Sequence, residues 1–325
     1  MDYIAKRFEN WNGTPYKSSH IKELADAVLF LEKRDQFLKD VYEEETLINY
    51  TIDALAGDIG LEKGLLEKWL QAIDRKGQAI IFGPPGTGKT FLAEHLARHL
   101  VSDGDGFVEL VQFHPAYAYE DFIQGIRPQA RPDGTLEYSV VPGRFLEFCR
   151  KAQDKDGICV LIIDEINRAN LARVFGELMY LLEYRNKDIP LSVDGTLFQI
   201  PENVRIIGTM NTADRSIALV DHALRRRFAF IQLRPNFDIL RRYHAREGTE
   251  FPVESLVSVL TNLNREIKDP HYELGISYFL CKDLNAEMEG IWRMEIEPYL
   301  DEYFFDNRTS ADKFRWESIR SSLGF

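Results

Sequence analysis

The sequence predicts an α/β protein in which a parallel sheet presents a phosphate-binding loop. The run Gly83-Pro84-Pro85-Gly86-Thr87-Gly88-Lys89-Thr90 fits the pattern G-x-x-x-x-G-K-[ST] at every specified position. Over residues 51–235, short apolar runs alternate with helical segments, as they do in a parallel sheet covered by helices. Residues 236–325 then keep a helical apolar spacing. We therefore expect a nucleotide-binding α/β domain followed by a smaller helical domain.

The phosphate loop has the flanking segments that its chemistry requires. Residues 78–82 read as a buried strand before it, and residues 91–100 have helical periodicity after it. The glycines let consecutive backbone N–H groups wrap a phosphate, and the positive end of the following helix points at the same anion. Lys89 would neutralise the β- and γ-phosphates, and the Thr90 hydroxyl would hold Mg²⁺. We expect this loop, together with Phe91, to bind a nucleoside triphosphate.

Composition limits the kinds of partner. The chain has 325 residues and a net charge of −12, from 40 Lys and Arg against 52 Asp and Glu. Such a charge repels a polyanion at long range, so contact with nucleic acid should come from a local patch, a fused module or a partner protein. No apolar stretch approaches the roughly 18 residues that span a bilayer, and the N-terminus lacks the apolar core of a signal peptide. We expect a cytoplasmic protein with no membrane contact.

Cysteine and histidine spacing predicts no further metal site. Cys149, Cys159 and Cys281 are widely separated and form no C-x-x-C pair. The seven histidines include no H-E-x-x-H arrangement. The expected metal is therefore Mg²⁺ alone.

The remaining elements follow in chain order. Residues 1–50 are polar and helical in character, which predicts an N-terminal extension or connector. The α/β domain is expected over residues 51–235 and the helical domain over residues 236–325. The expected strands are residues 78–82, 108–113, 159–164, 204–210 and 228–233. Besides the helix after the phosphate loop, helices are expected over residues 120–126 and 174–183, a loop or hairpin insertion over residues 128–135, and a hairpin turning at Asp194-Gly195 over residues 188–201.

A second motif lies at the end of the third expected strand. Leu161-Ile162-Ile163-Asp164-Glu165 is an apolar run that ends in two carboxylates. Asp164 would hold Mg²⁺, and Glu165 would polarise the attacking water. By itself this pattern also fits a capped turn. Its position about 75 residues after a phosphate loop favours the catalytic interpretation.

Polar residues follow the next strand as well. Asn211 ends an apolar strand and could orient the water or touch the γ-phosphate, although an ordinary turn fits it too. Further on, Arg225, Arg226 and Arg227 precede the last strand. They form either a solvated basic turn or an arginine finger that enters a neighbouring subunit's site, where a planar fork of donors suits phosphoryl oxygens.

This set of motifs, in this order and with a C-terminal helical lid, resembles the AAA+ ATPases. Within them the chain resembles the McrB-type motor subunits, which hydrolyse GTP in modification-dependent restriction systems. The resemblance covers residues 51–306 and is strongest in three stretches. These are Gln112-Phe113-His114-Pro115-Ala116-Tyr117-Ala118-Tyr119-Glu120-Asp121-Phe122-Ile123-Gln124-Gly125, Ile163-Asp164-Glu165-Ile166-Asn167-Arg168-Ala169-Asn170 and Met210-Asn211-Thr212-Ala213-Asp214-Arg215-Ser216.

The resemblance implies how the chain works in an assembly. It implies a five-stranded parallel sheet, a helical lid, and a homo-oligomeric ring, a hexamer, with nucleotide sites at the subunit boundaries. It makes Arg226 the first choice for the finger that acts in trans, Arg227 the second, and Arg225 structural. It also implies a McrC-like nuclease subunit as partner, with GTP hydrolysis driving translocation on DNA that is held by the complex or by a separate recognition domain.

Two departures from the family pattern matter. The family usually carries a DNA-reading domain before the motor, and residues 1–50 are too few to form one. In relatives the lid motif reads Ile-Gly-His-Ser-Tyr-Phe, whereas Ile276 replaces the histidine here. We therefore assign no sensor role to Ile276, and Ser277 is a weaker candidate for which core packing is the alternative.

Two other functions remain open on the sequence. One is an ATP-dependent remodelling chaperone of the MoxR kind, which shares the Asp-Glu-Ile-Asn-Arg-Ala core. The stretch from Asn211 to Ser216 favours McrB over it. The other is a non-hydrolysing, nucleotide-dependent scaffold. It is disfavoured by the presence of Lys89, Asp164, Glu165 and Asn211.

The choice between GTP and ATP depends on the contact with the base. In AAA+ proteins the base lies against the segment ahead of the phosphate loop, here residues 51–66. A carboxylate can accept hydrogen bonds from both N1–H and the amino group of guanine, whereas adenine would leave it unpaired. We place Asp58 at that edge of the base, with Asp53 as the fallback. A turn cap beside Gly57 and Gly60 is the alternative role for Asp58.

Overall fold

The computed structural model describes residues 49–130, 135–213 and 222–325. Of the N-terminal extension predicted for residues 1–50, only Asn49 and Tyr50 lie within these ranges. The tip of the predicted insertion, residues 131–134, and the stretch that begins with Asp214, residues 214–221, also lie outside them.

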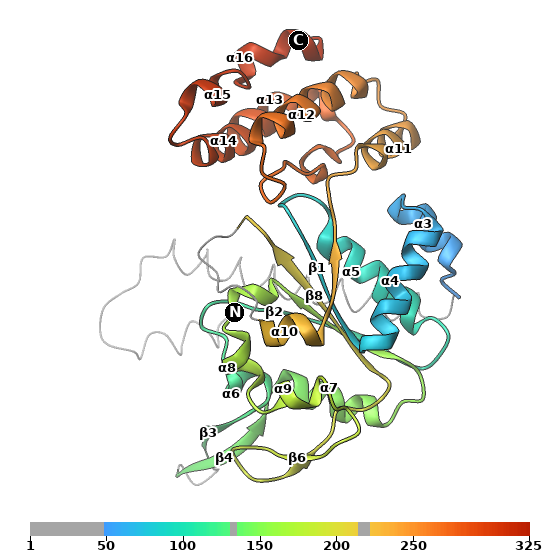
Figure 1. The fold of residues 1–325 in the computed structure, drawn as a ribbon, viewed down its shortest axis with the longest axis vertical. Coiled ribbons are helices and arrows are strands. Elements are labelled where there is room, and N and C mark those ends of the chain that lie inside the picture. Colours follow the sequence, from blue (N-terminus) through green and yellow to red (C-terminus); the bar gives the residue numbers. More distant parts are fainter. Residues whose placement is uncertain (1–48, 131–134, 214–221) are drawn as a thin grey trace. The chain divides into compact units, whose positions relative to one another are not determined.

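The described chain contains the predicted five-stranded parallel sheet, with strand order β2-β5-β8-β1-β9 (Figure 1). Its strands are β1 (Gln78–Gly83), β2 (Val108–Gln112), β5 (Cys159–Asp164), β8 (Val204–Asn211) and β9 (Ala229–Gln232). Because all five run in the same direction, their carboxyl ends meet at one edge. The register pairs Gly83 with Asn211 and Gln112 with Asp164 at that edge.

The central strands are apolar because both of their faces are covered. Alternate residues of one strand point to opposite faces, so that Ile81 and Ile162 pack in one core while Ile80 and Ile163 pack in the other. The first core includes α3 (Ile52–Ile59), α4 (Lys63–Lys76) and α5 (Lys89–Val101). The second includes α7 (Arg144–Gln153), α8 (Leu171–Phe175) and α9 (Leu178–Leu181).

Two predicted helices differ from the structure. The helix expected over residues 120–126 ends early: α6 covers Tyr119–Phe122, and β3 (Gln124–Ala130) pairs antiparallel with β4 (Leu136–Pro142). The gain from pairing with a strand further along the chain therefore outweighs the local helical pattern. The helix expected over residues 174–183 is divided into α8 and α9 at Gly176, whose φ of +50° breaks the helical conformation.

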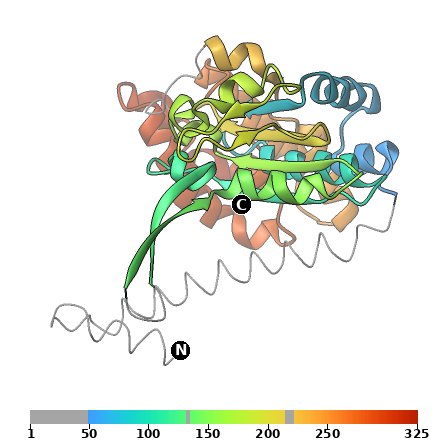
Figure 2. The same ribbon diagram turned by 90° about the horizontal axis from the view of Figure 1, so that it is seen from below.

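Both expected hairpins are present. The β3–β4 pair is the predicted insertion, and its strands run side by side away from the sheet (Figure 2). The second hairpin pairs β6 (Ile189–Pro190) with β7 (Leu197–Phe198). It turns at Asp194 and Gly195 as predicted: Gly195 has φ +71°, and the Asp194 carboxylate accepts hydrogen bonds from the N–H and hydroxyl of Thr196.

The C-terminal region is helical, as predicted, and has its own buried apolar core. Its main helices are α11 (Phe237–Glu247), α12 (Val253–Ile267), α13 (Leu284–Ile291), α14 (Glu297–Tyr303), α15 (Arg308–Asp312) and α16 (Trp316–Ile319), with a π-helical turn over Trp292–Ile296. No helix in the described ranges is both long enough and apolar enough to cross a bilayer.

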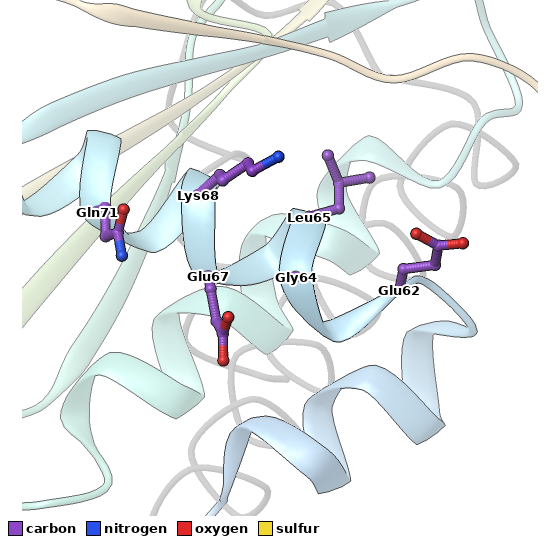
Figure 3. A pocket seen from close by; sticks show the side chains of 6 residues that line it. All are labelled: Glu62, Gly64, Leu65, Glu67, Lys68 and Gln71. Atoms are coloured by element: carbon purple, nitrogen blue, oxygen red, sulfur yellow. The ribbon is translucent and has the colours of Figure 1, made fainter.

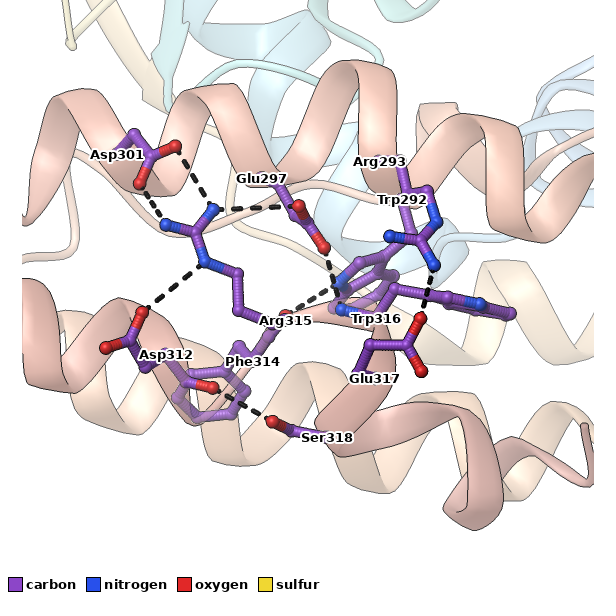
Figure 4. Close-up of polar contacts among 10 residues, drawn as sticks. All are labelled: Trp292, Arg293, Glu297, Asp301, Asp312, Phe314, Arg315, Trp316, Glu317 and Ser318. Atoms are coloured by element: carbon purple, nitrogen blue, oxygen red, sulfur yellow. Dashed lines mark hydrogen bonds and ion pairs between the residues drawn. The ribbon is translucent and has the colours of Figure 1, made fainter.

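Arg315 joins the last helices of this region to α14 (Figure 4). Its guanidinium pairs with Asp301, and lies 3.6 Å from both Glu297 and Asp312. Glu297 also accepts a 2.7 Å hydrogen bond from the backbone N–H of Trp316, and the Trp292 indole donates to the Phe314 carbonyl at 2.7 Å. These contacts fix the chain between α15 and α16.

Replacing Arg315 by alanine should lower the free energy of unfolding by about 1 kcal/mol at neutral pH. The guanidinium lowers the pKa of the Asp301 carboxyl, mainly through its hydrogen bond. A carboxyl with a depressed pKa in the folded protein stabilises the fold above its unfolded pKa of about 3.9, and this contribution is lost as the pH falls through the folded value. The difference between wild type and variant should therefore shrink below about pH 4.

Denaturant unfolding at several pH values would measure this difference. The control is Arg320→Ala, which removes one exposed ion pair with Glu317 and should change stability by less than about 0.5 kcal/mol. Equal effects of both variants at every pH would contradict the role given to Arg315.

Candidate functional site

The phosphate loop connects β1 to α5 with two glycines in the left-handed region. Gly86 has φ +73° and Gly88 has φ +84°, conformations that other residues rarely adopt. Gly88 is the N-cap of α5 and supplies no side-chain cap, so the first-turn N–H groups keep their capacity to bind an anion. Lys89 is 7% exposed, and its ammonium donates to the Pro84 carbonyl at 2.7 Å. The predicted loop residues therefore form a compact turn between β1 and α5.

Asp164 receives hydrogen bonds from three other elements. Its Oδ1 accepts from the Thr90 hydroxyl at 2.8 Å and from the Thr209 hydroxyl at 2.7 Å. Its Oδ2 accepts from the Gln112 amide at 3.4 Å. The carboxylate is buried, and these donors satisfy its charge in the structure.

The same oxygens fit a magnesium ion. A hydroxyl and a carboxylate are the hard oxygen donors that Mg²⁺ prefers, and Mg²⁺ takes its remaining ligands from water and substrate phosphates. The described residues hold no group of three His, Cys, Asp or Glu side chains that could bind a metal by themselves. A metal at Thr90 and Asp164 would therefore need the nucleotide to complete its coordination.

Glu165 lies next to this pair and is held by the end of β8. It adopts φ +54°, which is unusual for a residue with a side chain and often marks a functional position. Its N–H donates to the Thr209 hydroxyl at 3.2 Å, and its Oε1 accepts a short hydrogen bond from the Asn211 amide. Its Oε2 lies 3.5 Å from the Arg168 guanidinium. The structure thus brings two separately predicted site residues, Glu165 and Asn211, into contact.

Sequence reasoning missed two polar residues at this edge. Thr209, 2% exposed, links Asp164 to Glu165, and its only signal in the sequence is a hydroxyl within an otherwise apolar strand. Asn167, 5% exposed, donates to the Asn211 carbonyl at 3.2 Å. The sequence signal for Asn167 was its place in the stretch from Ile163 to Asn170, which carries part of the family resemblance.

The lid region contacts the phosphate loop through backbone groups. The Gly275 N–H donates to the Pro85 carbonyl at 3.2 Å, and the Ser277 N–H donates to the Gly86 carbonyl at 2.9 Å. A Cβ placed on Gly275 would lie 2.0 Å from the carbonyl carbon of Gly86, so only glycine fits there. Ser277 therefore lies against the loop, whereas Ile276 is buried in the lid core.

The segment that carries the three arginines lies at the amino-terminal ends of the strands, opposite the end that carries the phosphate loop. The arginines occupy α10 (His222–Arg227), directly before β9, whose first residue Ala229 pairs with Ala79 at the beginning of β1. The Arg226 side chain is 72% exposed and that of Arg227 is 16% exposed. Arg225 lies over the Phe230 ring at 5.7 Å. The end of α10, where the Arg227 carbonyl is bonded to Gln78, is separated from the phosphate loop of the same chain by the length of β1.

The segment predicted to contact the base is α3 and its flanks. The Tyr50 hydroxyl donates to Asp58 Oδ2 at 2.7 Å, so that Asp58 has a defined orientation. Asp53 instead pairs with Lys63 at 2.7 Å on the surface. Phe91 is 48% exposed, and its ring lies against that of His95, with ring centres 4.0 Å apart and the ring planes tilted by 41°.

A separate cavity of about 500 Å³ lies along α4 (Figure 3). Its lining consists of Glu62, Gly64, Leu65, Glu67, Lys68 and Gln71. All come from α4 and its N-cap, and three of them, Glu62, Gly64 and Leu65, fall within residues 51–66, the segment predicted to lie against the base.

Substituting alanine for Gly275 should weaken nucleotide binding about tenfold. The added Cβ would force the lid segment away from the phosphate loop, and a clash of this kind typically costs about 1–3 kcal/mol. Titration with a fluorescent nucleotide would measure the effect. Gly290→Ala is the matched control, because a Cβ there has open space. Unchanged affinity in Gly275→Ala would show that the lid contact does not support the loop.

Comparison with known proteins agrees with this geometry. Residues 78–228 match the AAA domain of the dynein-related subfamily, and residues 255–312 match the α-helical lid domain of McrB. The type IV methyl-directed restriction enzyme EcoKMcrB subunit of Escherichia coli K12 is 39% identical over 290 residues, which cover 82% of this chain and 62% of that protein.

A second relative is the type II restriction enzyme BsuMI component YdiS of Bacillus subtilis 168. It is 31% identical over 210 residues, which cover 52% of this chain and 60% of the relative. The chain thus spans about three fifths of the length of both relatives. The α/β fold, the lid and these similarities identify an AAA domain over residues 78–228, followed by an α-helical lid domain of the McrB kind over residues 255–312.

Proposed function

We propose that this chain is the motor of a modification-dependent restriction system. It hydrolyses GTP in a ring, a hexamer, and drives DNA translocation for a McrC-like nuclease subunit. The observation that carries the proposal is the contact of Glu165 with Asn211 beside Asp164 and Thr90. The relatives are named as a subunit and a component of restriction enzymes, which supports a partner subunit.

The residues at the carboxyl edge of the sheet divide the work of hydrolysis. The loop N–H groups and Lys89 hold the phosphates. Thr90 and Asp164 would hold Mg²⁺, which supplies positive charge to the β- and γ-phosphates. Glu165 accepts a hydrogen bond from the attacking water and polarises it, and Asn211 holds the Glu165 carboxylate in place. Most of the catalysis then comes from positioning and electrostatic stabilisation.

The arginines support a site that is completed in trans. Charge develops on the γ-phosphoryl oxygens during transfer, and an arginine stabilises it. Within one chain, α10 and the phosphate loop lie at opposite ends of β1, about 13 Å apart along the strand. A ring would place α10 of one subunit beside the phosphate loop of the next. Arg226, the more exposed side chain, is our choice for the group that reaches across.

Rings mixed from two variants should separate the role of Glu165 in its own subunit's site from the role of Arg226 in the neighbour's site. Glu165→Gln should bind triphosphate but lose most hydrolysis, Lys89→Ala should lose binding itself, and Arg226→Ala should lose roughly 10³–10⁵ in rate. When Glu165→Gln and Arg226→Ala subunits are mixed, turnover should return, because the first lends its arginine to the intact site of the second. Phosphate release at a series of mixing ratios would measure it. No recovery at any ratio would refute the trans role.

Selectivity for guanine should depend on Asp58. We expect the ring to turn over GTP in preference to ATP, and we expect the McrC-like partner to stimulate it. Asp58→Asn should reduce the preference for GTP over ATP by about 1–3 kcal/mol, the scale of a bidentate base contact. Competition binding with both nucleotides would measure it, with Asp74→Asn as the control, because Asp74 is an exposed, ion-paired carboxylate outside residues 51–66. An unchanged preference in a folded, ring-forming Asp58→Asn protein would exclude this residue.

A further inference from the structure

Glu183 binds the side chains of both candidate trans arginines. It follows α9 in sequence, far along the chain from α10. Its Oε1 lies 2.8 Å from Arg226 Nη2, and its Oε2 lies 3.3 Å from Arg227 Nη2. Each carboxylate oxygen thus serves one guanidinium group, an arrangement that fixes the two arginines relative to each other.

The backbone carbonyls of the same two arginines accept hydrogen bonds from the end of α4 and the beginning of β1. The Gln78 amide nitrogen donates to the Arg227 carbonyl at 2.7 Å and to the Leu182 carbonyl at 2.8 Å. The Lys76 ammonium donates to the Arg226 carbonyl at 2.9 Å. Gln78 is 1% exposed, so this anchor is part of the protein interior. It connects the residue before Glu183 to the residue after Arg226.

A buried cation fixes the orientation of the Gln78 amide. Arg185 Nη2 donates to Gln78 Oε1 at 2.8 Å and to the Gly77 carbonyl at 3.1 Å, and Arg185 Nη1 donates to the Val204 carbonyl at 2.6 Å. Burial lowers the pKa of Arg185 to about 10, so the guanidinium remains charged at neutral pH. Because Gln78 Oε1 faces a cation, its nitrogen must face the two carbonyls.

The two arginines differ in how much freedom this network leaves them. The Arg227 side chain is 16% exposed, whereas that of Arg226 is 72% exposed. An exposed ion pair contributes little to stability, so Arg226 can exchange the carboxylate for a stronger anion at little cost. A nucleoside triphosphate with its cluster of negative oxygens is such an anion.

We propose that Glu183 is a positioning residue for hydrolysis at the neighbouring subunit's site. It holds Arg227 in place and directs Arg226 outward, where the triphosphate of the next subunit takes over its guanidinium, while Gln78 keeps the backbone beneath fixed. This inference rests on the proposed action of Arg226 in trans. It assigns to Glu183 a role in the neighbour's site and none in its own.

The mixed-ring assay can test this asymmetry with Glu183→Gln, which keeps the size of the side chain and removes its charge. We call the subunit that lends its arginine the donor and the subunit whose site receives it the acceptor. The donor carries Glu165→Gln together with Glu183→Gln, and the acceptor carries Arg226→Ala. Turnover recovered in this mixture should fall by about 10- to 100-fold relative to the donor with intact Glu183, as expected for a misplaced catalytic group. When Glu183→Gln is placed in the acceptor instead, recovery should be unchanged, because the acceptor's own arginine is already absent.

Two controls separate positioning from loss of structure. Glu109→Gln also removes a carboxylate that lies near two cations, Lys151 and Arg144, but at the other edge of the sheet, and in the donor it should leave recovery unchanged. The donor with Glu183→Gln should also bind GTP with the affinity of the Glu165→Gln protein. The assay detects phosphate release, and a fluorescent GTP analogue reports binding.

Three results of the mixed-ring assay would contradict the role of Glu183, and they differ in what they imply for Arg226. Equal recovery with and without Glu183 in the donor overturns this inference and leaves the trans action of Arg226 standing. A loss of recovery of the same size in the acceptor also overturns it, because Glu183 would then serve its own subunit. No recovery between the simple Glu165→Gln and Arg226→Ala proteins refutes the trans arginine, and the role of Glu183 with it.

Discussion

The arrangement of the site depends on the hydrogen bonds that the buried carboxylate of Asp164 accepts. A buried charge must be satisfied by hydrogen bonds, and Asp164 obtains them from the Thr90 and Thr209 hydroxyls and the Gln112 amide. These donors come from the beginning of α5, the end of β8 and the end of β2. One carboxylate therefore sets the relative positions of the phosphate loop, the strand that carries Asn211 and the edge strand.

Thr209 extends this arrangement to Glu165. Its hydroxyl donates to Asp164 and accepts from the Glu165 N–H, which stabilises the left-handed backbone of Glu165. That conformation turns the Glu165 side chain toward Asn211. A residue with this backbone persists only where its surroundings hold it. The metal-binding carboxylate and the water-activating carboxylate we propose are thus positioned by the same hydroxyl.

β1 connects the phosphate loop to the arginine segment. In the proposed ring, the phosphate loop of one subunit lies beside the arginine segment of the next. At its carboxyl end β1 passes into the phosphate loop, against which Gly275 and Ser277 of the lid form backbone hydrogen bonds. At its amino end Gln78 holds the carbonyl of Arg227. One strand of six residues therefore supports both the proposed nucleotide site of its own subunit and the arginine segment proposed to serve the next.

The sequence by itself determined the elements whose signals are local. The phosphate loop, strand β5 at residues 159–164 and the turn at Asp194 and Gly195 were all predicted correctly, because their residues are contiguous and their chemistry requires particular neighbours. Only the tertiary structure decided the rest. It replaced part of the helix predicted over residues 120–126 with a strand, since β4 supplies hydrogen bonds that local spacing cannot reveal. It also joined Glu183 to Arg226 and Gly275 to the phosphate loop, contacts between residues far apart in the chain that exist only once the sheet and the lid have packed.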